Sequence, residues 1–196
     1  RQMSTALLAR RRFLPLFITQ FLGAFNDNVF KNALVILVTF QAASCSDSPL
    51  LVTVAAGLFI VPFFLFSATA GQFADKMDKA RMIRLTKLAE IGIMTLGAFG
   101  FLMHSVELLM VVLFAMGAQS AIFGPLKYGI LPQHLEREAL MGANALLQGS
   151  TFIAILAGTV LGGTLIVVPE RGAMLTAIGI IVIALAGWAV SRSIPD

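Results

Sequence analysis

Six apolar stretches, each long enough to cross a lipid bilayer as a helix, take up most of this chain of 196 residues. A spanning helix needs roughly 20 mostly apolar residues, and only helices or closed barrels satisfy every backbone polar group inside lipid. Hydrophobic residues make up 58% of the chain and charged residues 12%, more than one soluble core can bury. Runs this long do not alternate as barrel strands do. The sequence therefore predicts an all-α membrane protein with spans at about 13–40, 50–70, 83–103, 108–126, 146–168 and 173–190.

The basic residues fall in alternate connections between these stretches. The net charge of +4 could suggest nucleic acid, but a binding surface would gather the charges on one folded face. The connections at 41–49, 104–107 and 169–172 hold a single basic residue, Arg171. The positive-inside rule then places these three turns outside the cell and both termini in the cytoplasm. The basic side comprises Arg1, Arg10, Arg11, Arg12, Lys76, Lys79, Arg81, Arg84, Lys87, Lys127, Arg137 and Arg192.

Residues that usually carry metal, redox or nucleophilic chemistry are sparse. Cys45 is the only cysteine, so no internal disulfide can form. His104 and His134 have no neighbouring cysteine or histidine at metal-ligand spacing. The sequence holds no Ser-His-Asp set, no H-x-x-x-x-D acyltransferase signature and no Gly-rich phosphate loop. We expect no cofactor, no metal site and no enzymatic activity within these residues.

The third stretch is the least regular span, because its uninterrupted apolar part, 91–103, is too short to cross a bilayer alone. Arg84 and Lys87 are expected to extend toward the cytoplasmic headgroups, with their alkyl stems in the apolar layer. Glu90 is expected to face protein or water, most simply in a salt bridge to Lys87 or Arg84.

Small residues recur in the fifth stretch, in the sequence AGTVLGGTL at 157–165. Gly158, Gly162 and Gly163 have the small-xxx-small spacing that lets two membrane helices approach closely. We expect this glycine face to pack against another helix, and a gating role is secondary.

The first stretch carries a polar stripe in the middle of the segment QFLGAFNDNVFKNALVIL, 20–37. At 100° per residue, one narrow face holds Gln20, Gly23, Asp27 and Lys31. An ionised group at mid-membrane costs about 2.5–3.5 kcal/mol. Asp27 and Lys31 are i, i+4 neighbours with the acid first, so one interpretation is an ion pair that fixes helix packing. A water-filled substrate or ion path is favoured, because that pair leaves further polar residues unexplained. These are Gln20, Asn26, Asn28 and Asn32.

The connection between the second and third stretches reads GQFADKMDKARMIR, 71–84. It resembles the loop signature of the major facilitator superfamily, G-x-x-x-D-[RK]-x-G-[RK]-x-[RK]. Asp78 stands where the family usually has its second glycine. The resemblance implies one six-helix half of a transporter, made of two inverted three-helix repeats. It also implies a gating role without substrate contact for the matching residues Gly71, Asp75, Lys76, Lys79 and Arg81.

Two further motifs, QFLGAFNDN at 20–28 and GPLKYGILP at 124–132, resemble the bacterial lysophospholipid transporter branch of that superfamily. The resemblance extends over essentially the whole chain, and its NDNVFKNALV segment is most like transporters fused to an acyltransferase and acyl-carrier-protein ligase. It implies movement of lysophospholipid, chiefly lysophosphatidylethanolamine, from the outer to the inner leaflet of the bacterial inner membrane for re-acylation. The partners implied are a C-terminal transporter half, absent from this chain, and the acyltransferase and ligase, fused or separate.

Under this resemblance, the polar stripe becomes a headgroup site. Asp27 is expected to bind the ammonium group or a coupling ion, Na⁺ or H⁺, and Lys31 or Lys127 the phosphate. Gln20, Asn28 and Asn32 are expected to bind the glycerol part by hydrogen bonds. Lys127 could equally be a headgroup-facing anchor, because it falls at the cytoplasmic end of its helix.

Two alternatives remain open at the level of sequence. A proton-coupled drug or metabolite exporter of the same superfamily would use Asp27 as its protonation site. A purely structural anchor for a fused enzyme would need no buried charges, so the polar stripe argues against it.

Overall fold

The fold is described from a computed structural model, which describes residue 7 and residues 11–41 and 48–195. Arg1, Arg10, Cys45 and most of the turn expected at 41–49 lie outside the described residues. Within the described residues, six helices are long and apolar enough to cross a membrane, and this confirms the predicted multi-pass, all-α architecture. The elements are α2 (Leu14–Gln41), α3 (Ser48–Lys76), α4 (Lys79–Leu102), α5 (Val106–Gly129), α6 (Leu131–His134), α7 (Arg137–Ile166) and α8 (Gly172–Ser191).

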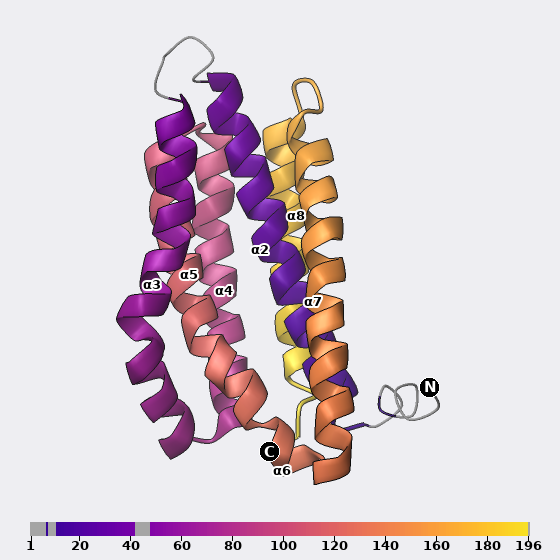
Figure 1. The fold of residues 1–196 in the computed structure, drawn as a ribbon. Coiled ribbons are helices and arrows are strands. Elements are labelled where there is room, and N and C mark those ends of the chain that lie inside the picture. Colours follow the sequence, from indigo (N-terminus) through magenta and orange to yellow (C-terminus); the bar gives the residue numbers. More distant parts are fainter. Residues whose placement is uncertain (1–6, 8–10, 42–47, 196) are drawn as a thin grey trace.

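The long helices form two groups of three (Figure 1). Helices α2, α7 and α8 pack together, as do α3, α4 and α5, and α4 joins the groups by packing along α8. The contacts can be compared by matching α2 with α5, α3 with α7 and α4 with α8. Under this matching, the extensive contact between α2 and α7 corresponds to the one between α5 and α3. The contact of α2 with α8 likewise corresponds to that of α5 with α4. This correspondence agrees with two three-helix repeats, the second running in the opposite direction to the first (Figure 1).

Four helices extend clearly beyond the apolar stretches that predict them, and α7 does so most, because it begins at Arg137 and its predicted span begins at 146. Helix α4 begins at Lys79 because the Asp78 side chain caps it, accepting a hydrogen bond from the Arg81 backbone N–H at 3.0 Å. Helix α5 contains Pro125 and continues to Gly129, beyond the predicted span of 108–126. The connection expected at 71–84 is divided between the end of α3 and the start of α4, and only Met77 and Asp78 lie between the two helices. Apolar length alone underestimates helices whose polar ends project beyond the hydrocarbon layer.

The glycines of α7 hold it against α2, as their spacing predicts. A Cβ atom added to Gly158 would meet the Phe25 carbonyl of α2, and one added to Gly162 would meet the Val29 carbonyl. A side chain at Gly163 would meet the Asn32 amide at 2.8 Å. The two backbones therefore approach closely enough that only hydrogen fits at these positions. This interface fixes the face that α2 presents to its other neighbours.

Many large apolar side chains lie exposed on the outer surface of the helices, as expected of helices in contact with lipid or with another protein segment. The interior packs around Phe30 and Phe101, whose ring centroids lie 5.2 Å apart in an edge-to-face arrangement. Helix α3 is the least enclosed, and Phe64 is 81% exposed there.

Candidate functional site

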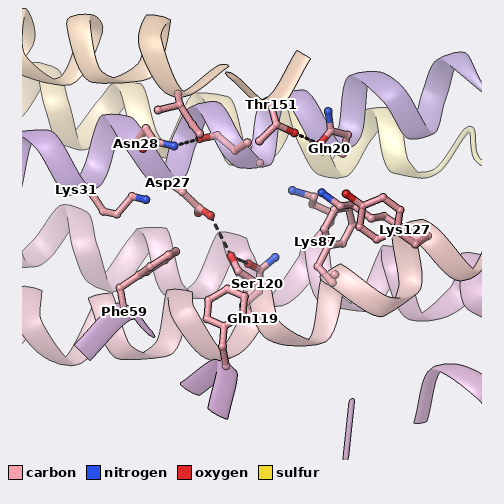
Figure 2. Close-up of a pocket in the computed structure, with 17 residues that line it drawn as sticks. Gln20, Asp27, Asn28, Lys31, Phe59, Lys87, Gln119, Ser120, Lys127 and Thr151 are labelled. Carbon is pink, nitrogen blue, oxygen red and sulfur yellow. Dashed lines mark hydrogen bonds between the residues drawn. The ribbon is translucent and has the colours of Figure 1, made fainter. Parts of the chain in front are cut away.

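A polar cavity of about 360 Å³ opens between α2, α3, α4, α5 and α7. Figure 2 shows its side chains converging from the surrounding helices. The wall from α2 carries the predicted polar stripe, and the wall from α3 and α5 adds aromatic rings. The lining residues are Gln20, Gly23, Ala24, Asp27, Asn28, Lys31, Phe59, Phe63, Lys87, Gln119, Ser120, Phe123, Gly124, Lys127, Tyr128, Thr151 and Ile155.

Asp27 and Lys31 both line this cavity but form no salt bridge with each other in the described part of the chain. Asp27 Oδ2 accepts a hydrogen bond from the Ser120 hydroxyl of α5 at 3.0 Å (Figure 2). The Lys31 ammonium lies 4.2 Å from the centroid of the Phe59 ring of α3, a cation–π contact. The interpretation of the two residues as a mutually neutralising ion pair is therefore not supported. Each charge is turned to a different partner beside the same cavity.

The amides of the polar stripe are divided between the cavity and the helix interfaces. Gln20 lines the cavity, yet its amide bonds to α7 at the Leu147 carbonyl and the Ser150 and Thr151 hydroxyls. Asn28 also lines the cavity and donates to the Ala24 carbonyl at 2.7 Å.

Asn32 is not among the cavity residues. Its amide donates to the Thr159 carbonyl of α7 at 2.7 Å, beside the glycine face. The structure therefore does not place Asn32 with the other predicted substrate-binding residues, because the tight α2–α7 contact turns that position away.

Lys127 lies on the cavity wall near the end of α5. Its ammonium lies 4.9 Å from the centroid of the Tyr128 ring. Of the two roles that the sequence leaves open, the geometry favours the cavity.

Lys87 does not extend to the headgroup layer, so that expectation is wrong. Its side chain is 1% exposed and lines the cavity, and Nζ donates to Glu90 Oε2 at 2.6 Å. The salt bridge expected between Glu90 and Lys87 is confirmed. Further donors reach the same carboxylate, the Gln119 amide at 3.3 Å and the Asn26 amide at 3.5 Å. Arg84, in contrast, donates to the Ile194 carbonyl at 2.6 Å, near the end of the chain.

The predicted gating residues lie apart from the cavity. Gly71 and Lys76 are in the last turns of α3, and Lys79 and Arg81 are in the first turn of α4. The side chain of Asp75 lies outside the described residues. None of the described members of this set lines the cavity.

Several cavity residues are not singled out by the sequence analysis. Ser120, Gln119 and Thr151 are single small or amide residues in apolar helices, and Phe59 is one aromatic residue among many. Only the packing of α3, α5 and α7 brings them to α2. A search for polar residues at the depth of Asp27 in the other spans could have found Ser120 and Gln119.

A second, apolar pocket of about 300 Å³ adjoins the polar cavity and shares Lys31 and Phe59 with it. Its remaining lining is aliphatic, from α2, α3 and α5. A polar compartment and an apolar compartment with two residues in common are suited to a ligand that has a charged end and a hydrocarbon end.

Comparisons with known proteins agree with the resemblance drawn from the sequence motifs. The family model for the Major Facilitator Superfamily matches residues 16–196. A lysophospholipid transporter LplT of Photorhabdus laumondii is 32% identical over 158 residues, 81% of this chain and 37% of that protein. Transporters of the same name from Salmonella arizonae (32% over 161 residues, 81% and 37%) and Salmonella newport (34% over 152 residues, 78% and 36%) are also similar. The chain thus spans less than two fifths of the curated relatives it matches. No solved structure matches the chain.

Proposed function

The chain belongs to the major facilitator superfamily, and on that premise we propose that it is the N-terminal six-helix half of a secondary transporter for lysophospholipid. The observation that carries this proposal is the polar cavity between the helices, lined by a carboxylate and three ammonium groups that come from three helices. The relatives named as lysophospholipid transporters support the substrate class. A second six-helix half would close the cavity on the side that the exposed face of α3 leaves open.

The cavity lowers the cost of moving a zwitterionic headgroup through hydrocarbon. A phosphate or ammonium group that loses its water without gaining a partner is strongly destabilised in an apolar medium. We assign the ammonium group of the lipid to Asp27 and the phosphate to Lys31 or Lys127, with Gln20 and Asn28 near the glycerol hydroxyl. Charge-assisted hydrogen bonds of this kind replace the lost hydration. The single acyl chain enters the apolar pocket next to Lys31 and Phe59.

The direction of movement and the cellular setting extend the same proposal. Basic residues in alternate connections favour cytoplasmic termini in a bacterial inner membrane. Lysophospholipid then moves from the outer to the inner leaflet, where an acyltransferase with an acyl-carrier-protein ligase, fused or separate, restores the second acyl chain. Residues Gly71, Asp75, Lys76, Lys79 and Arg81 act at the cytoplasmic ends of α3 and α4 as a gate between the halves.

The direct test is uptake of labelled lysophosphatidylethanolamine by spheroplasts that express the full-length protein. Asp27→Asn and Lys31→Ala are expected to abolish most uptake at normal expression. Thr39→Ala is the matched control, because Thr39 lies on the same helix, bonds only to the Val35 carbonyl and does not line the cavity. Wild-type uptake in both cavity variants would overturn the proposal.

Competition separates this function from proton-coupled export of a drug or metabolite. Unlabelled lysophospholipid should displace the bound ligand of a lysolipid carrier. An exporter of the same superfamily would bind its own substrate without interference from lysophospholipid, and that result would favour the exporter.

A further inference from the structure

The Lys87 ammonium group lies at the wall of the polar cavity with only part of its hydrogen-bonding capacity used. It donates to Glu90 at 2.6 Å and lies 5.1 Å from the centroid of the Phe123 ring, which also lines the cavity. An ammonium group has three N–H donors. Glu90 is its one hydrogen-bond acceptor among the residues that the structure describes, so two donors have no protein partner. Buried donors are rarely left unpaired, so this site points to a ligand.

Glu90 fixes the position of Lys87 from outside the cavity lining. The carboxylate is not part of the cavity lining, whereas Lys87 is. Gln119 and Asn26 also donate to Glu90, so two neutral amides hold the carboxylate in place beside Lys87. The N–H donors of Lys87 that Glu90 does not use are at the cavity wall, where an anion can accept from them.

Gly23 of α2 leaves the space that this ammonium group occupies beside the cavity. A Cβ atom at Gly23 would overlap Lys87 Nζ, so only glycine leaves the ammonium where it lies. Along α2, Gly23, Asp27 and Lys31 follow one another by one helical turn, about 6 Å each. The cavity wall thus presents Lys87, then Asp27, then Lys31, with charges of alternating sign. Figure 2 shows Lys31 on one side of Asp27 and both Lys87 and Lys127 on the other.

We propose that Lys87, together with Lys127, forms a second phosphate position on the side of Asp27 opposite Lys31. This inference rests on the proposed function and deepens it. The phosphate of the lipid moves from Lys31 to Lys87 and Lys127 while Asp27 stays close to the ammonium group. Glu90 is a positioning residue, because it fixes Lys87 without touching the substrate.

The test compares two lipids with the same acyl chain, lysophosphatidylethanolamine and a monoacylglycerol that lacks the phosphate. Binding to the purified full-length protein is measured for the wild type and for the double variant Lys87→Met with Glu90→Gln, which removes both buried charges together. The double variant should lose about tenfold or more in affinity for the phospholipid. Its affinity for the monoacylglycerol should change by less than about twofold. Equal losses for both lipids, or no loss for either, would overturn the inference.

A second variant keeps the test decisive if the double variant does not fold. Gly23→Ala moves the ammonium of Lys87 without removing a charge, and should weaken phospholipid binding selectively. Gly92→Ala is the matched control, because Gly92 lies on α4 with no atom within 4 Å of an added Cβ. Wild-type selectivity in Gly23→Ala would likewise count against the second phosphate position.

Failure of the proposed function would give different binding results from failure of the inference alone. If the wild type itself does not bind lysophosphatidylethanolamine, the lysolipid function is wrong and the inference falls with it. If Lys31→Ala loses phospholipid affinity while the Lys87 and Gly23 variants keep it, the function stands and only the inference is overturned.

Discussion

Two neighbouring polar clusters in the bundle contain similar residues in different environments. One cluster joins α4 to Asn26 of α2 and Gln119 of α5, and the other lies on α2 beside the cavity. In the sealed cluster, Lys87 and Glu90 are paired at 2.6 Å with the Asn26 and Gln119 amides around them, and each of these four residues is at most 8% exposed. In the open cluster, Asp27 and Lys31 lie one turn apart on a helix and still form no direct salt bridge.

The difference shows that an intramembrane charge is not sufficient to identify a ligand site. A buried ion pair costs less than two isolated charges and stabilises one arrangement of helices. Charges that face a shared cavity with different partners keep their capacity to bind something else. The open cluster therefore contains the proposed headgroup site, and the sealed cluster supports it through Lys87.

The largest effect on stability is expected when one residue of the Lys87–Glu90 pair loses its charge. Glu90→Gln leaves the Lys87 charge buried without its counter-ion, which should lower the free energy of unfolding by about 3–5 kcal/mol. Glu107→Gln is the control, because Glu107 is exposed at the start of α5. Thermal unfolding of the purified protein in detergent measures both. Equal stability of the two variants would show that Lys87 and Glu90 are not a sealed pair.

A smaller effect separates the two asparagines of α2. Asn32→Ala removes a hydrogen bond to the Thr159 carbonyl and should cost about 1 kcal/mol of stability while leaving lysolipid uptake unchanged. Asn28→Ala removes a cavity residue that bonds only to its own helix, and should reduce uptake with little loss of stability. Loss of uptake in the Asn32 variant would restore the substrate role that the sequence predicts.

The smallest change in stability is expected in the open cluster. Ser120→Ala removes the hydroxyl bonded to Asp27, but water in the cavity can replace it, so stability should change by less than about 0.5 kcal/mol. Uptake should nevertheless fall, because the Asp27 carboxylate loses the group that orients it. A large loss of stability would mean that this cluster is sealed as well.

The number of helices, the glycine packing of α7 and the polar face of α2 could all be predicted from the sequence, because apolar length and helical spacing determine them. The sequence could not predict which polar side chains of α2 reach the cavity. Asn32 and Asn28 are the same residue type one turn apart, and only the position of α7 decides which one reaches the cavity. Lys87 is misjudged for a similar reason. Its place near the start of α4 suggests an anchor, while its partner Glu90 and the missing side chain at Gly23 draw it inward.

The contacts of α2 also bear on how the protein is made. Its main partners, α7 and α8, are the last two long helices of this chain to leave the ribosome. The Phe59 ring beside Lys31 is made with the next helix, whereas Asp27 lacks its Ser120 partner until α5 has been synthesised. An ionised group without a partner at mid-membrane costs about 2.5–3.5 kcal/mol. The first long helix of this chain completes its contacts only after more than a hundred further residues have been synthesised.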